Sequence, residues 1–171
     1  EEAKKRLDES LSYYQLKLED LALYDAAYSA ERAYTARIWS NMTRFFPSRL
    51  IPDDEDLSGI AQNLQADASI LATYADLLYE EVFGLPIQWV VALIPEYSFI
   101  DPYESLDAAG TGIDNHEWTM AAFEALESEV RSGLAIEFIN VLVLAEDEQA
   151  ATAMMKEIAN KSRAKAHIAI E

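Results

Sequence analysis

Apolar residues recur along the first quarter of the chain at spacings of three and four, the period of one face of an α-helix. The pattern begins near Leu7 and continues past Tyr24, where it becomes a stripe of alanines. Such a stripe allows a second helix to approach closely. Pro47 then interrupts the pattern. The sequence therefore predicts one long helix over residues 2–46.

The most regular heptad in the chain predicts a second helix over residues 54–83. Leucine alternates with alanine or valine at its core positions: Leu57, Ala61, Leu64, Ala68, Leu71, Ala75, Leu78 and Val82. A second apolar flank widens this face: Ile60, Ile70, Tyr74 and Leu77. We expect this helix to contact more than one neighbour. Because the connector is short, the two long helices should run antiparallel.

The second half of the chain shows shorter and less regular patterns. Residues 87–94 and 134–144 are apolar with β-branched side chains, and residues 167–170 alternate, so strands are predicted there. Helices are predicted over 116–132 and 146–161, with a long loop over 96–115.

These elements predict an α+β, helix-dominated fold. It combines a long antiparallel helical pair (about 2–46 and 54–83) with a C-terminal β-α-β-α-β part. The alternative is an all-α helical bundle in which residues 116–164 form one very long helix. With 171 residues and 51% hydrophobic composition, we expect a single domain over 1–171. Its parts would be a helical hairpin at 1–84 and a mixed α/β portion at 85–171.

The two ends of the chain and its cysteine content say little about compartment. No apolar stretch is long enough to span a bilayer. The first residue is Glu rather than Met, so we expect a processed or trimmed product, and the loss of a signal or anchor segment from either end stays an open alternative. Cysteine is absent, which excludes disulfides and thiolate metal sites. A cytoplasmic and an extracytoplasmic location both fit these features.

The net charge of −18 is concentrated in one region. Residues 50–130 contain seventeen acids and no Lys or Arg, whereas the flanking segments are nearly neutral. This uneven distribution argues against a general adaptation to high salt. It also argues against direct binding of nucleic acid, which requires clustered Lys and Arg side chains. Three explanations of the acidic region remain: a surface for a basic partner, a divalent-cation site, and a charge that only keeps the protein soluble.

Two acidic groups are candidate binding sites. The first is the predicted loop, which offers carboxylates for a hard cation such as calcium or magnesium: Asp101, Glu104, Asp107, Asp114 and Glu117, with His116 beside them. Their spacing does not match an EF-hand, which favours a solvated acidic loop. The second is the group Asp76, Glu80 and Glu81, predicted to bind a partner. No other cofactor and no catalytic residue is predicted.

The leading functional hypothesis is a non-enzymatic interaction or structural and assembly module. Its acidic face would meet a basic or cationic partner, with a partner protein or self-association expected. One alternative is an acidic inhibitor that mimics nucleic acid. Another is an extracytoplasmic ligand-sensing domain with a pocket lined by Trp89, Tyr97 and Tyr103. A third is a divalent-metal-dependent hydrolase that uses the carboxylates around Glu80.

Overall fold

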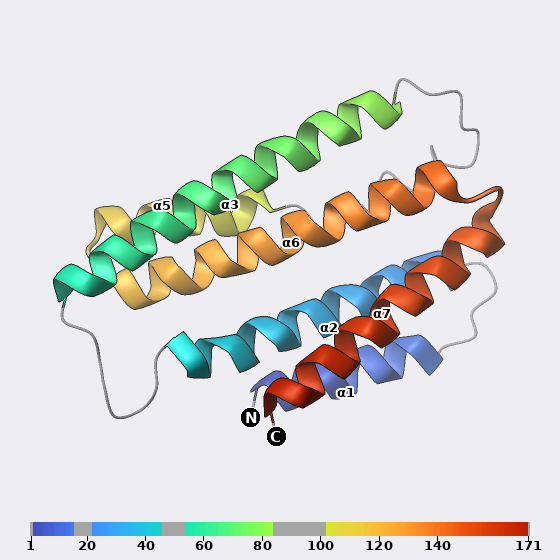
Figure 1. Ribbon diagram of the computed structural model, residues 1–171, viewed down its shortest axis with the longest axis horizontal. Helices are drawn as coiled ribbons and strands as arrows, with labels where there is room; N and C mark the ends of the chain where they lie inside the picture. The colour runs from blue at the N-terminus through green and yellow to red at the C-terminus, as the bar shows by residue number, and fades with distance from the viewer. Residues whose placement is uncertain (1, 16–21, 46–53, 84–101, 171) are drawn as a thin grey trace.

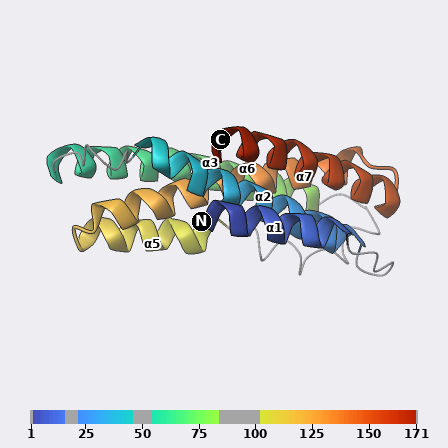
Figure 2. The same cartoon turned by 90° about the horizontal axis from the view of Figure 1, so that it is seen from below.

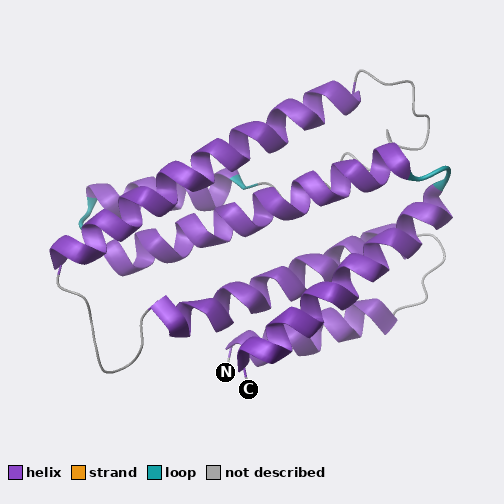
Figure 3. Cartoon of the chain, viewed as in Figure 1, coloured by secondary structure: helices purple, strands orange, loops and turns teal. Residues whose placement is uncertain are grey.

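The computed structural model describes residues 2–15, 22–45, 54–83 and 102–170. These residues form six α-helices and no strand (Figures 1 and 3): α1 (Glu2–Gln15), α2 (Ala22–Phe45), α3 (Asp54–Phe83), α5 (Tyr103–Asp114), α6 (Trp118–Leu144) and α7 (Glu148–Ile170). The predicted α+β fold is therefore wrong, and the described part of the protein is all-α.

The helices form two groups of three. One group contains α1, α2 and α7, and the other contains α3, α5 and α6. Helix α6 also packs against α2 and touches α7, so it joins the two groups (Figures 1 and 2). Helix α3 lies on the far side of α6 from α2 (Figure 1). Each group buries an apolar face that its helices could not bury alone.

Helix α2 is the central helix of its group and contacts α1, α6 and α7. Its alanines are completely buried or nearly so: Ala26, Ala27, Ala30, Ala33 and Ala36. Small side chains let the neighbouring backbones come close. On α7, the facing core residues are Ala151, Met155 and Ala159. The close approach predicted from the alanine stripe is confirmed.

The residues predicted as the strand 134–144 form the second half of α6 instead. Helix α6 packs against α3 and α5 on one side and α2 on another, so it buries apolar side chains around most of its circumference. Leu134, Phe138 and Ile139 are at most 2% exposed. A helix buried all round loses the amphipathic period. Its continuous apolar run then resembles a buried strand, and Gly133 lies within the helix.

Several predicted boundaries also need correction. Residues 2–46 contain two described helices, α1 and α2, which pack against each other. The predicted pair of long helices does reverse direction, but α6 lies between α2 and α3 (Figure 1). The bounds of α3 match the prediction of residues 54–83. Residues 167–170, predicted as a strand, complete α7, and the predicted strand 87–94 lies outside the described residues.

The predicted loop 96–115 contains α5, and a tight turn joins α5 to α6. His116 adopts a φ of 63°, the left-handed conformation common just after a helix. The His116 N–H donates to Ile113 O (3.1 Å), and the Glu117 N–H donates to Gly112 O (2.8 Å). These two hydrogen bonds make a Schellman motif. His116 therefore ends α5, whereas the sequence placed it in the first turn of the next helix.

Gly112 allows α5 to cross α6 at short range. A Cβ at this position would lie 3.0–3.1 Å from side-chain and backbone atoms of Ala121. Gly59 of α3 is the opposite case, because a Cβ there would meet nothing within 4 Å. The α5–α6 crossing is tight, while this part of α3 is open.

Candidate functional site

Helix α3 has two different faces. Its Leu/Ala seam packs against α6, and Leu57, Ala61, Ala68, Ala75 and Val82 are buried. Of the flank that was expected to widen this buried face, Ile60 is half-buried, but the other three residues point outward instead. Ile70, Tyr74 and Leu77 are 69%, 52% and 60% exposed, respectively. They recur at i, i+4 and i+7 and form one continuous apolar surface, here called the α3 stripe.

Carboxylates border the α3 stripe. Asp67, Asp76, Glu80 and Glu81 are all exposed. On a helical wheel, Asp76 and Glu80 fall on one side of the stripe and Asp67 on the other, with Glu81 at its C-terminal end. Within the described part of the chain, no Lys or Arg forms an ion pair with any of these four acids. The predicted group Asp76, Glu80 and Glu81 is thus exposed at one site.

An open groove runs between α3 and α5 next to the stripe. Its volume is about 620 Å³, and its lining is mostly polar: Gln65, Ala66, Ser69, Leu106, Asp107, Gly110, Thr111 and Asp114. Ala66 is one helical turn before Ile70, so the groove and the stripe are adjacent. We call the exposed acids of this region the acidic face: Asp67, Asp76, Glu80 and Glu81 of α3 with Asp107 and Asp114 of α5.

The residues of the predicted cation loop lie on a helix and the turn that follows it. Glu104, Asp107 and Asp114 belong to α5, Glu117 precedes α6, and all four are exposed. Glu104 lies 3.9 Å from the Arg131 guanidinium. Asp101 is outside the described residues. Across the described ranges, no three acids or histidines come together in a way that would hold a metal ion.

The residues of the predicted ligand pocket are only partly described. Trp89 and Tyr97 lie outside the described residues, and Tyr103 is half-buried at the start of α5. A ligand pocket at these residues therefore stays a prediction. None of the described helices combines the length and apolar character that crossing a membrane requires.

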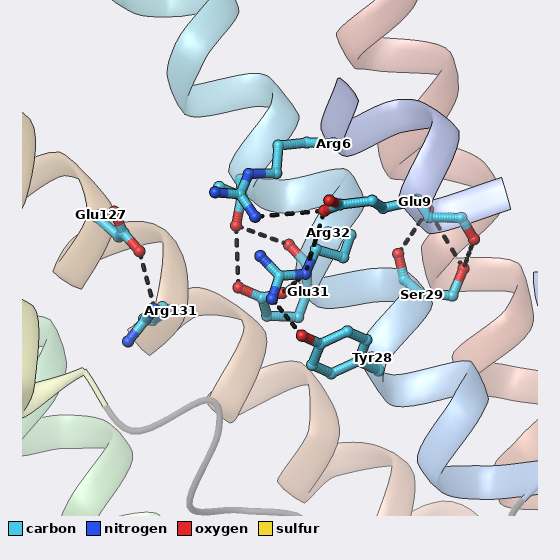
Figure 4. Close-up of polar contacts among 10 residues, drawn as sticks. Arg6, Glu9, Tyr28, Ser29, Glu31, Arg32, Glu127 and Arg131 are labelled. Carbon is cyan, nitrogen blue, oxygen red and sulfur yellow. Dashed lines mark hydrogen bonds and ion pairs between the residues drawn. The ribbon is translucent and has the colours of Figure 1, made fainter. Parts of the chain in front are cut away.

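A network of charges lies where α1 and α2 face α6 (Figure 4). Glu9 Oε2 is 3.3 Å from Arg6 Nη1 and 3.6 Å from Arg32 Nε. Arg32 Nε also lies 3.2 Å from Glu31 Oε2, and Arg32 donates a hydrogen bond to the Tyr28 hydroxyl. On α6, Arg131 forms an ion pair with Glu127 at 2.9 Å. Here, in contrast to the acidic face, acids and bases neutralise one another.

Glu31 is the most buried acid of this network, with 3% of its surface exposed. Burial raises the pKa of its carboxyl, while the charges of Arg32 and Arg131 and a hydrogen bond from Thr35 act in the opposite direction. Asp25, one turn and a half earlier on α2, is also 3% exposed. Burial raises its pKa too, opposed by the charge of Lys156. Both acids are therefore part of the protein's interior.

A second buried polar group connects α1, α2 and α7. Arg163 of α7 donates hydrogen bonds from Nη1 to Ser10 Oγ (2.9 Å) and Ser29 Oγ (2.8 Å). The two serines also donate to each other's backbone carbonyls, at 2.6 and 2.7 Å. The guanidinium lies over the Tyr14 ring, 4.4 Å from its centroid. Burial lowers the pKa of Arg163. We call Ser10, Ser29 and Arg163 the Ser–Arg cluster.

Sequence reasoning missed both interior groups. The available signal was the position of polar residues within an apolar face. Asp25, Ser29 and Glu31 interrupt the alanine stripe of α2, and Ser10 of α1 and Arg163 of α7 occur at similarly inward positions. A buried charge in such a place requires partners on a neighbouring helix. Which helix supplies them depends on tertiary packing.

Comparisons with protein-family models, with curated protein sequences and with solved structures gave no match.

Proposed function

We propose that this protein is a non-enzymatic interaction module whose acidic face binds a basic partner. The observation that carries the proposal is the contrast between paired and unpaired acids. Glu9, Glu31 and Glu127, which lie near α1 and α2, each have a cationic partner at short distance. Among the described residues, Asp67, Asp76, Glu80 and Glu81 of α3 have no ion-pair partner.

Physical chemistry supports a role in recognition rather than in folding. Seventeen acids without a base over residues 50–130 repel one another and produce a negative potential over this region. Such a potential increases the association rate of a basic partner and selects against acidic ones. The exposed apolar residues of the stripe add surface that a partner can bury.

The proposal can be tested with a pair of charge-matched variants. One variant neutralises the acidic face: Asp67→Asn, Glu80→Gln, Glu81→Gln and Asp107→Asn. The control neutralises the same number of exposed acids elsewhere: Asp8→Asn, Glu146→Gln, Glu148→Gln and Glu157→Gln. Both variants have the same net charge, so a difference between them reports the position of the charge.

The probe is an unstructured lysine-rich peptide, and its Kd is measured by fluorescence anisotropy. We expect the acidic-face variant to bind about tenfold more weakly than wild type, and the control to stay within about twofold. We also expect wild-type binding to weaken when ionic strength rises from about 0.05 to 0.5 M, since salt screens exposed charges. Equal binding by the two variants would contradict the proposal.

A further inference from the structure

The geometry points to the class of partner that the acidic face receives: an amphipathic helix of another protein, apolar on one side and basic along its edges. This inference rests on the proposed function and makes it more specific. It starts from the α3 stripe, which an ordinary solvated acidic helix would not have.

The stripe has the dimensions of a helix-docking surface. From Asp67 to Glu81 the axis of α3 extends about 21 Å at the helical rise per residue. Ile70, Tyr74 and Leu77 stand along this length with more than half of each residue exposed. Apolar residues at i, i+4 and i+7 are the pattern that a second helix meets in side-by-side packing.

The charges around the stripe specify the partner's edges. Asp76 and Glu80 lie on the side of the stripe that faces the α3–α5 groove, where Asp107 and Asp114 line the wall. A lysine or arginine on that edge of the partner can reach these carboxylates while its apolar residues cover Tyr74 and Leu77. Asp67 offers the same complementarity on the other edge. Long basic side chains suit such positions because their aliphatic stems also cover apolar surface.

A second copy of this chain is the weaker candidate for this surface. In a two-fold contact the same patch of both copies meets, so the carboxylates of one copy would face those of the other. Like charges at an interface oppose association. Anionic membranes are disfavoured for the same reason, because helices that lie on them carry Lys and Arg beside the apolar face.

The test uses two labelled peptides of about 20 residues, long enough to form a helix on binding. The first has leucines on one helical face and lysines on both edges. The second has the same composition in an order without an apolar face. We expect the amphipathic peptide to bind wild type at least about tenfold more tightly than the reordered peptide. A gain in helical circular dichroism should accompany binding.

Two double variants locate the binding site. Ile70→Gln with Leu77→Gln removes the apolar surface of the stripe, and we expect about tenfold weaker binding of the amphipathic peptide. The matched control is Val143→Gln with Leu144→Gln, since these residues of α6 are 48% and 70% exposed. The control should bind as wild type does. Circular dichroism of each free variant checks that the fold is retained.

The outcomes separate this inference from the proposed function. If both peptides bind equally well and both lose affinity when Glu80 and Glu81 become Gln, the proposed binding of a basic partner is kept and the inference of an amphipathic helical partner is overturned. If neither peptide binds, the proposed function and the inference are both overturned. If the stripe variant binds the amphipathic peptide as wild type does, the inference fails. If the free protein is a dimer in sedimentation and the stripe variant is a monomer, a second copy occupies the surface and the inference fails.

Discussion

Helices α2 and α3 contain the same kinds of residues and use them differently. Both are rich in alanine and both carry acids. In α2 the alanines face three neighbouring helices, and Asp25 and Glu31 are buried among them. In α3 the Leu/Ala seam faces inward toward α6, whereas Asp67, Asp76, Glu80, Glu81 and the α3 stripe face outward.

This difference teaches that the surroundings of a helix, rather than its composition, decide what its acids do. A helix enclosed by neighbours must pair its charges internally, because an unpaired buried charge costs several kcal/mol. Glu31 accordingly lies beside Arg32, whereas for Asp25 only the charge of Lys156 opposes the effect of burial on its carboxyl pKa. A helix with an open face has no such requirement. Its acids add little to stability and are available for a partner.

The largest expected effect on stability comes from a substitution in the Ser–Arg cluster. Arg163→Ala removes a buried cation and leaves the hydroxyls of Ser10 and Ser29 without its hydrogen bonds. We expect the free energy of unfolding to fall by about 3 kcal/mol in urea denaturation. Lys161→Ala is the control: Lys161 is exposed, and its ion pair with the exposed Glu157 is screened by solvent and should add little to stability. Equal losses would show that the Ser–Arg cluster does not hold α7 on α1 and α2.

Two adjacent leucines of α3 allow its inward and outward faces to be compared by substitution. Leu78 packs against the core between α3 and α6, whereas Leu77 belongs to the stripe. Leu78→Ala should lower the free energy of unfolding by about 2 kcal/mol through lost packing. Leu77→Ala should change it by less than about 0.5 kcal/mol. A large loss in the second variant would mean that the stripe is covered within the protein.

Glu31 predicts a dependence of stability on pH. Because burial raises the pKa of Glu31, ionisation of this carboxyl opposes folding at neutral pH. The free energy of unfolding should therefore rise as the pH falls from 7 through the raised pKa toward the ordinary value of about 4.3. Glu31→Gln cannot ionise and should show a smaller rise in urea denaturation over this range. Asp25, Glu124 and Glu129, whose pKa values burial also raises, contribute the remainder. Identical pH profiles would contradict the role given to Glu31.

Two glycines with opposite surroundings should give effects of opposite sign. Gly59→Ala on the open part of α3 should raise the free energy of unfolding by about 0.5–1 kcal/mol, because alanine favours the helix and meets no atom. Gly112→Ala should lower it by about 1–3 kcal/mol, since the added methyl group meets Ala121. Thermal melting of the two variants would show shifts of opposite sign. Shifts of the same sign would contradict the difference between the tight α5–α6 crossing at Gly112 and the open surface of α3 at Gly59.

The sequence predicted the regular helix α3 well and the enclosed helix α6 badly. A heptad such as Leu57 to Val82 identifies a helix with one buried face. Helix α6 is buried on several sides, so Leu134, Phe138 and Ile139 follow no single face and the segment resembled a strand. The same pattern of apolar residues therefore has two meanings, and only tertiary packing separates them.

The acidic face was partly predictable. The absence of Lys and Arg from residues 50–130 is visible in the sequence and pointed to Asp76, Glu80 and Glu81. The sequence could not show that Ile70, Tyr74 and Leu77 are exposed, because an apolar flank on a helix ordinarily predicts burial. The partners of Arg163 come from helices more than 130 residues apart in the chain, which no local pattern reveals.

The most direct test of the central claim is hydroxyl-radical labelling of Tyr74 with and without the amphipathic basic peptide. In the free protein, Tyr74 is 52% exposed and Tyr34 only 8%, so Tyr74 should be labelled much faster. Saturating peptide should protect Tyr74 and leave the labelling of Tyr34 unchanged. Slow labelling of Tyr74 in the free protein, or no protection by bound peptide, would contradict the claim that the outward face of α3 is an open site for a basic partner.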